Sequence, residues 1–108
     1  MVPIEKVKDI VIEHNSLEKE LSSGNLDPKL FAEKSKKYSR LGNIISVARK
    51  YVNFENEKKD LDNLLQDKTN DQEMIELAQK DLNELKEKKK IYENKLKLFL
   101  LPKDEDDD

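Results

Sequence analysis

Two stretches of this chain repeat apolar residues at alternating steps of three and four, and this heptad spacing constrains the fold more than any other feature. On a helix, such spacing gathers the apolar residues into one seam. The first seam is Ile44, Val47, Tyr51, Phe54, Lys58, Leu61 and Leu65. The second seam is Ile75, Ala78, Leu82, Leu85, Lys89, Tyr92, Leu96 and Phe99. Because residues 66–70 between them are all polar, we predict an antiparallel coiled-coil hairpin.

A turn near residue 70 sets the register of this hairpin, since the numbers of facing residues should then sum to about 140. The expected pairs are Leu65 with Ile75, Leu61 with Ala78, Phe54 with Leu85, and Ile44 with Leu96. Each seam also contains one lysine. Lys58 would face Leu82 and Lys89 would face Tyr51, so each lysine could bury its methylene stem while its ammonium stays in water.

Two shorter helices are predicted ahead of the hairpin. The first begins at Pro3, a residue suited to the first helical position, and residues 22–25 supply its stop and turn. Its apolar stripe is Ile4, Val7, Ile10, Val11, His14, Leu17 and Leu21. Asp27 and Pro28 then start a second helix, which carries Leu30, Phe31, Tyr38 and Leu41. We expect both helices to cover an open flank of the hairpin, which gives an all-α, elongated helical bundle.

The composition agrees with an all-α protein. Charged residues make up 42% of the chain and there are only two glycines, which suits long two-faced helices more than a sheet with many tight turns. The absence of cysteine excludes disulfides and thiolate chemistry and fits a reducing compartment, so we expect a cytoplasmic protein. No apolar stretch approaches the roughly 18 residues of a membrane span, and Glu5 and Asp9 argue against a signal or transit peptide.

The end of the chain is typical of a domain edge. An apolar run to Leu101 stops at Pro102, and residues 103–108 contain five acids and one lysine. We therefore expect a helical domain over residues 1–102 and an acidic linker over residues 103–108. Residues 1–102 hold 20 basic and 19 acidic residues. This near-neutral balance argues against general nucleic-acid binding, although a local lysine patch remains open.

No catalytic constellation is present in the sequence. There is no phosphate-binding glycine loop, no paired metal-ligand motif on a helix and no nucleophile with a plausible base. We therefore predict no catalytic residue, no cofactor and no metal ion, and a small helical enzyme is disfavoured. His14 is expected to pack at the core, as are Tyr38, Tyr51 and Tyr92. The acid cluster 104–108 lacks the glycine-punctuated spacing of a calcium loop.

A run of lysines is the nearest approach to a phosphate-binding patch. It comprises Lys86, Lys88, Lys89 and Lys90, and Glu84, Glu87 and Glu93 interleave with it. This pattern favours a solvated helix face with ion pairs at i,i+4 spacing. A contact with RNA or with the ribosome is the alternative.

Two stretches resemble a known family. Residues from Asp71 to Ala78 and from Leu96 to Asp104 are similar to the end of the N-terminal helical domain of bacterial class I peptide chain release factors. The run Leu100-Leu101-Pro102-Lys103-Asp104 is the more specific and resembles the prokaryotic or mitochondrial type that reads UAA and UAG. Residues from Phe31 to Ile45 fit the family more weakly, and Gln72 stands where a proline is common.

The resemblance implies a role in translation termination. Such a factor enters the ribosomal A site, recognises a stop codon and triggers hydrolysis of peptidyl-tRNA. Later domains carry these activities through a Pro-x-Thr motif and a Gly-Gly-Gln motif, and neither motif occurs in these 108 residues. The fragment is thus expected to be no enzyme and to serve contact and positioning. The family's N-terminal domain reaches toward the stalk base of the large subunit, near ribosomal protein L11, and is linked to the translational GTPase that recycles the factor.

The residues for that contact are inferred from exposure alone, because tips and charged faces can touch a partner without unpacking a bundle. They are Gln66, Asp67 and Lys68 at the hairpin tip, and Lys86 and Lys90 on the lysine run. We expect the fragment to be a monomer. Periodicity and composition would equally support a free-standing coiled-coil scaffold, a chaperone-like module or a self-associating dimer.

Overall fold

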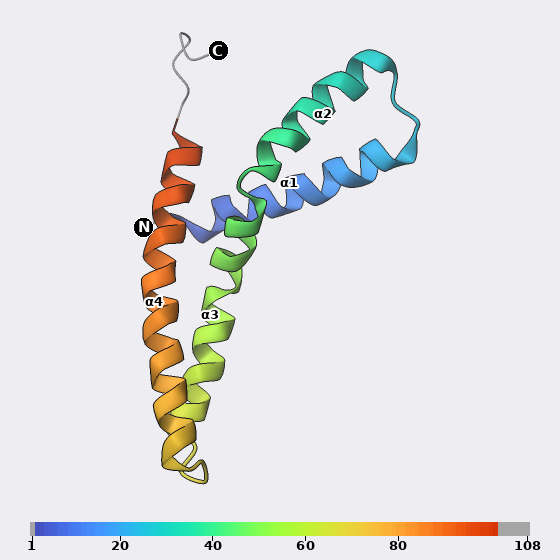
Figure 1. Cartoon of the computed structure of the whole chain (residues 1–108). Helices are drawn as coiled ribbons and strands as arrows, with labels where there is room; N and C mark the ends of the chain where they lie inside the picture. The colour runs from blue at the N-terminus through green and yellow to red at the C-terminus, as the bar shows by residue number, and fades with distance from the viewer. Residues whose placement is uncertain (1, 102–108) are drawn as a thin grey trace.

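The structure, a computed structural model, describes residues 2–101, and over that range it contains four α-helices and no strand. The helices are α1 (Ile4–Ser23), α2 (Pro28–Gly42), α3 (Ile45–Gln66) and α4 (Gln72–Leu100). Figure 1 shows α3 and α4 side by side, with α1 and α2 leaving one end of this pair. The predicted all-α class and the helical hairpin are confirmed.

Local chemistry explains where the helices start and stop. The side chains of Asp27 and Asp71 cap α2 and α4 by accepting hydrogen bonds, each of 2.8 Å, from the amides of Leu30 and Met74. Gly24 ends α1 with φ of 74°, in the left-handed region that glycine adopts without steric cost.

The start of α1 differs by one residue from the prediction. Pro3 has an extended backbone, with ψ of 127°, and therefore lies at the N-cap position, one residue before the helix begins at Ile4.

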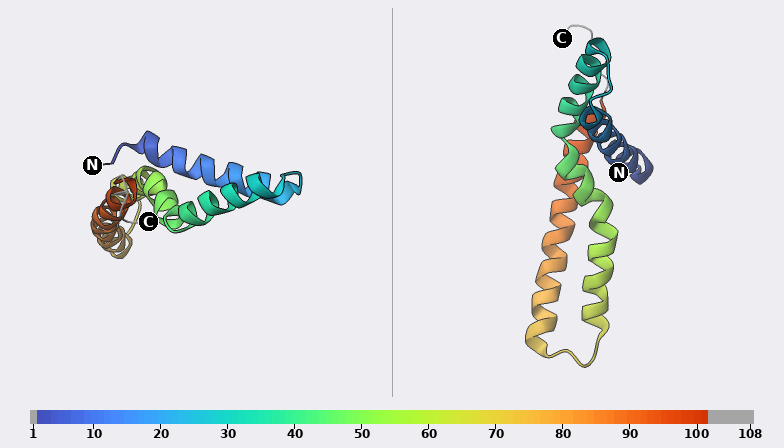
Figure 2. Two further views of the ribbon diagram at one scale, coloured as in Figure 1. Left: turned by 90° about the horizontal axis from the view of Figure 1, so that it is seen from above. Right: turned by 90° about the vertical axis from the view of Figure 1, so that its right-hand side faces the viewer.

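The α3–α4 hairpin is the longest part of the molecule, and Figure 2 shows its two helices adjacent along their length. Every residue of both predicted seams is buried or half-buried. Ile44 and Leu96 belong to one buried cluster, and Lys89 and Tyr51 line one small cavity, so each of these predicted pairs lies in one part of the hairpin. The exact register stays a prediction.

The main core lies where α1 crosses the end of the hairpin opposite its tip, which we call the upper part. Its buried members are Val2, Val7, Ile10, Leu17, Leu41, Ile44, Ala48, Tyr51 and Leu96. The side chain of Ala48 is completely buried, and its small size allows α1 and α3 to approach closely. The hydroxyl of Tyr51 donates a 2.7 Å hydrogen bond to the carbonyl of Val2, which ties the residues before α1 to α3.

The first two helices cover one end of the hairpin instead of its whole flank. Seen along the hairpin, α1 and α2 extend together to one side (Figure 2, left). Because α2 packs mainly on α1 and meets α3 only near Leu41, its first turns lie away from the hairpin. Leu30 and Phe31, expected in the covering face, are consequently 41% and 48% exposed.

The chain end remains partly a prediction. Helix α4 stops at Leu100, and Leu101 has an extended backbone with ψ of 138°. The predicted stop at Pro102 and the acidic linker 103–108 lie outside the described residues. Within residues 2–101, the longest apolar helical segments fall short of what a bilayer crossing requires.

Candidate partner-contact surfaces

The hairpin tip is an ordered polar loop. A carboxylate oxygen of Asp67 accepts hydrogen bonds from the amide and hydroxyl of Thr69, at 2.9 and 2.6 Å. The side chain of Asn70 donates to the carbonyl of Leu64, at 3.0 Å, and so closes the loop on the end of α3. The hydroxyl and the amide of Thr69, in that order, lower the pKa of Asp67. The tip therefore presents a fixed negative charge next to the exposed Lys68.

Exposed apolar side chains lie on the helices next to this loop. Leu64 on α3 is 37% exposed, and Met74 and Leu77 on α4 are 44% and 55% exposed. The sequence predicts a polar tip over residues 66–70, with Gln66, Asp67 and Lys68 as contact residues, and does not predict this apolar component. Leu64, Met74 and Leu77 are each adjacent in sequence to a seam residue. An apolar residue just outside a seam was therefore the sequence signal for this exposed apolar surface.

The lysine run on α4 divides into two kinds of side chain. Lys86, Lys88 and Lys90 are exposed, and the ammonium of Lys90 lies 3.5 Å from the carboxylate of Glu87. The predicted i,i+4 pairing occurs between Lys89 and Glu93, at 3.9 Å. A run of alternating charges on an exposed helix face contributes little to stability, so Lys86 and Lys90 are available to a partner.

Lys89 differs from the prediction. Its ammonium was expected in water, but it lies 4.6 Å from the centre of the Phe54 ring, and its side chain is only 25% exposed. A cation over an aromatic face is attracted by the ring quadrupole. This attraction, together with Glu93, keeps the ammonium at the seam.

The tip and the lysine run are separate surfaces. At about 1.5 Å of rise per residue, Lys86 and Lys90 lie about 21 and 27 Å along α4 from Gln72. Gln66 ends α3, and Asp67 and Lys68 follow it in the loop at the tip. The structure thus brings together the three tip residues but not the tip and the lysines, so one small partner site cannot include both.

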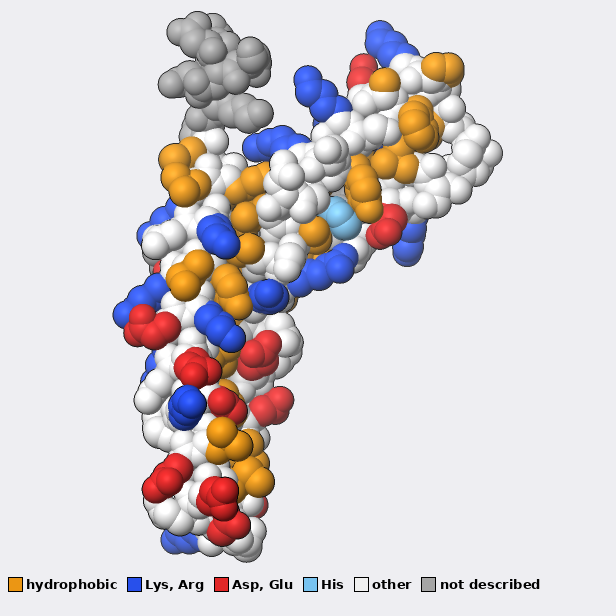
Figure 3. Space-filling model, in the orientation of Figure 1, with side chains coloured by type: hydrophobic (Ala, Val, Ile, Leu, Met, Phe, Trp, Pro, Cys, Tyr) orange, Lys and Arg blue, Asp and Glu red, His pale blue; other side chains and the backbone are white. Residues whose placement is uncertain are grey.

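The half of the hairpin nearest its tip, residues 57–84, is strongly acidic, and we call it the acidic arm. An open groove of about 350 Å³ between α3 and α4 is lined by Glu57, Asp60, Leu61, Asp81, Glu84, Leu85 and Lys88. Residues 57–84 contain nine acids and four bases, and Figure 3 shows acidic side chains gathering on this arm. Over residues 2–101, no three His, Asp or Glu side chains are arranged to hold a metal ion.

The remaining predicted residues pack as expected. His14 is buried and stacks on Tyr38, with 4.6 Å between ring centres and 27° between ring planes. Tyr51 is buried, and Tyr38 and Tyr92 are half-buried against the core. These side chains are structural.

Comparison with known proteins identifies what the chain resembles. Residues 10–108 match the family described as the PCRF domain. The chain is 53% identical over 107 residues to peptide chain release factor 1 of Pelagibacter ubique, with 99% of this chain and 30% of that protein covered. It is 32% identical over 107 residues to the protein of that name in Rhizobium rhizogenes, with the same coverage.

A third relative, peptide chain release factor 1 of Wolbachia pipientis, is 39% identical over 106 residues, with 94% of this chain and 28% of that protein covered. The chain therefore spans about 30% of the length of these relatives. No solved structure matches it.

Proposed function

Because this chain belongs to the peptide chain release factor family, we propose that it acts in translation termination as the N-terminal helical domain of such a factor. The observation that carries the proposal is the 53% identity over 99% of the chain. In this proposal residues 1–102 form the domain, and residues 103–108 begin a linker to the parts that read the codon and catalyse release. The site of action is the ribosome in the cytoplasm, and the stop codons are UAA and UAG.

The role proposed for this segment is contact and positioning, without hydrolysis of its own. A rigid bundle suits that role, because an ordered hairpin can hold a contact surface at a set distance from the main core. The free-standing scaffold is the weaker candidate, since periodicity supports it but the relatives do not.

The proposed contact residues are Gln66, Asp67 and Lys68 at the tip, with Lys86 and Lys90 as a second surface. We assign the tip to the stalk base near ribosomal protein L11, or to the recycling translational GTPase. The acidic arm and the exposed Leu64, Met74 and Leu77 favour a basic, partly apolar protein surface over RNA at the tip, because carboxylates are repelled by phosphates.

A domain exchange tests the termination role. The 107 aligned residues would replace the matching segment of the Pelagibacter ubique factor, and release of a labelled peptide would be measured on ribosomes carrying UAA, UAG or UGA. We expect a release rate within about threefold of the parent on UAA and UAG, since the catalytic groups are unchanged. The isolated chain should release nothing above background. A folded exchange protein that binds ribosomes normally but releases no peptide would overturn the proposal.

The tip contact is tested in the same exchange protein. Asp67→Asn removes one charge while retaining an acceptor for Thr69, and we expect it to weaken ribosome binding about twofold to fivefold. Asp9→Asn makes the same change of charge on an exposed position of α1 and should have no effect. Equal affinities for all three proteins would remove Asp67 from the contact.

A further inference from the structure

Helix α2 and the start of α3 carry a concentration of positive charge. Residues 28–50 contain seven basic residues and a single acid, Glu33, although residues 1–102 as a whole are nearly neutral. Figure 3 shows Lys and Arg side chains in a row along the upper edge of α2. This segment therefore has the opposite charge to the acidic arm of the hairpin.

Three of these residues share one side of the helix, which we call the α2 basic face: Lys29, Lys36 and Arg40. At 3.6 residues per turn, they lie within about 40° of one another around the helix, and Glu33 is the single acid beside them. The three basic side chains are exposed. They extend over about 16 Å of helix, at about 1.5 Å per residue.

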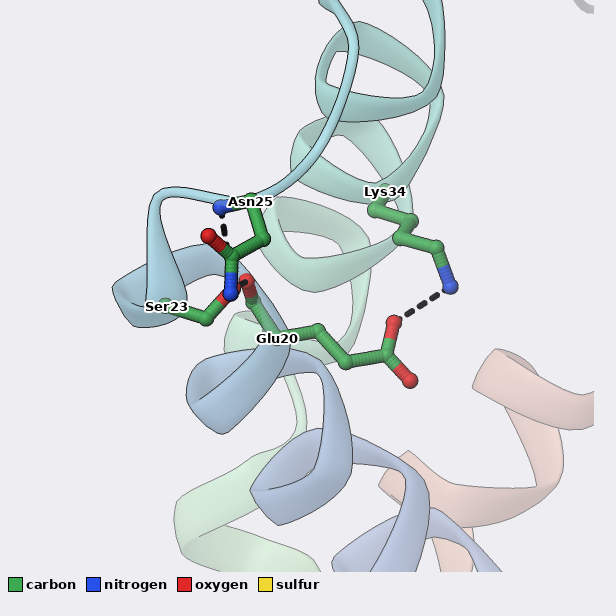
Figure 4. A network of polar contacts seen from close by, with 4 residues as sticks. All are labelled: Glu20, Ser23, Asn25 and Lys34. Carbon is green, nitrogen blue, oxygen red and sulfur yellow. Dashed lines mark hydrogen bonds and ion pairs between the residues drawn. The ribbon is translucent and has the colours of Figure 1, made fainter.

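The opposite side of α2 is held on α1, so the α2 basic face must point outward. Tyr38 stacks on His14, and the ammonium of Lys34 pairs with the carboxylate of Glu20. Figure 4 shows this pair beside the turn, where the Ser23 hydroxyl donates to the Glu20 carbonyl at 2.7 Å. Lys34 is thus neutralised internally, and Lys37 lines a groove with acidic side chains of α1. Lys29, Lys36 and Arg40 lie on the other side of α2.

Arg40 also joins α2 to the end of α4. Its guanidinium lies 4.6 Å from the centre of the Phe99 ring. Lys95 and Lys97 are exposed on the same end of α4, so further positive charge lies near this end of the α2 basic face. The contact fixes the direction of the guanidinium and extends the positive region across two helices.

We infer that the α2 basic face binds the phosphate backbone of RNA. Clustered lysine and arginine side chains gain affinity by releasing the counterions condensed on a polyanion. A membrane surface is disfavoured, because Tyr38 and Leu41 pack on the core and α2 exposes only Leu30 and Phe31 of its large apolar side chains, less apolar surface than an interfacial helix presents. The acidic arm would be repelled by the same polyanion, which orients the molecule. The choice of RNA as the polyanion depends on the proposed function.

The test uses the 108-residue chain and a fluorescein-labelled RNA duplex of about 20 base pairs, with anisotropy measured at roughly 50 to 200 mM KCl. The double variant Lys29→Gln, Lys36→Gln leaves the Arg40 contact with Phe99 intact. We expect it to weaken binding at least about tenfold at low salt and to reduce the slope of log K against log salt by about 2.

A matched variant controls for net charge. Lys59→Gln, Lys80→Gln removes two exposed lysines from the acidic arm, and we expect RNA affinity within about twofold of the parent. Circular dichroism verifies that both variants remain helical. Equal losses in the two variants, or no loss in the α2 variant, would overturn the inference.

Binding to vesicles that contain the anionic lipid phosphatidylglycerol tests whether the α2 basic face prefers a membrane surface to RNA. Binding to these vesicles without binding to the RNA duplex would assign the α2 basic face to membranes and overturn the inference. RNA binding by the isolated chain together with an inactive exchange protein would overturn the termination role alone. The two proposals can therefore fail independently.

Discussion

At the scale of single residues, Tyr51 connects the start of the chain to the hairpin. It is 4% exposed, and its hydroxyl satisfies the carbonyl of Val2, which is itself buried. Removing the hydroxyl leaves that carbonyl without this partner. We expect Tyr51→Phe to lower the free energy of unfolding by about 1 to 2 kcal/mol, measured by urea denaturation.

The same residue makes stability depend on pH. Burial raises the pKa of Tyr51 above its usual 10.0, and Glu93 adds to the rise. The neutral phenol is therefore favoured by folding, and its contribution is complete below pH 10 and lost as pH rises through the folded pKa. Stability should fall more steeply above pH 10 in the parent than in Tyr51→Phe. Parallel pH profiles for the two proteins would contradict this account.

His14 illustrates a polar group whose role is packing. Its ring stacks on Tyr38, and its Nδ1 finds no hydrogen-bond partner among residues 2–101. We expect His14→Phe to keep the stack and to leave thermal stability unchanged or raised by up to about 1 kcal/mol, since a buried unpaired nitrogen is removed. His14→Ala, which also removes the stack, should destabilise. A large loss in the Phe variant would indicate a polar role for the imidazole.

At the scale of helices, Lys89 is a half-buried lysine of the second seam whose ammonium lies over the Phe54 ring. Lys89→Leu loses the contact with Phe54, worth about 0.5 to 1 kcal/mol, and a partly exposed ion pair with Glu93. Burying a leucine at the same seam position contributes about 1.5 to 3 kcal/mol. The variant should therefore be more stable by about 1 kcal/mol in urea denaturation. Destabilisation would show that the cation–aromatic contact dominates.

Short-range patterns predicted most of the helical architecture. The caps at Asp27 and Asp71 involve residues three positions away, and the seams follow from the spacing of apolar residues. Both features are therefore determined by residues close together in the sequence. Phe31 is exposed, and Val2 and Ala48 are buried, because of how the first helices pack against α3. This packing depends on contacts between residues far apart in the sequence. For the candidate surfaces, the sequence predicts the polar loop and the lysine run. It does not predict which apolar side chains near the tip stay exposed, because that depends on how α3 and α4 pack together.

At the scale of the whole molecule, the shape departs from that of a compact domain. The radius of gyration is 18.8 Å, and the principal extents are 60, 34 and 19 Å. A compact chain of this length would have a radius of gyration of about 13 Å. Since α3 and α4 pair within one chain, we expect a monomer of 12.7 kDa in sedimentation equilibrium and a matching radius in small-angle X-ray scattering. A constant dimer mass across dilution would indicate that the seam is intermolecular.

The buried core of the hairpin becomes thinner from the end that contacts α1 toward the tip. Beyond Phe54, α3 has no fully buried side chain, whereas the upper part of the hairpin is packed against α1. Amide protons in α3 should therefore exchange with deuterium progressively faster from Tyr51 toward Gln66, because the openings that expose them break fewer contacts. Uniform protection along α3 would contradict this gradient. With such a gradient, the rare openings that expose amides near Gln66 would leave the packing of α1 on α3 intact.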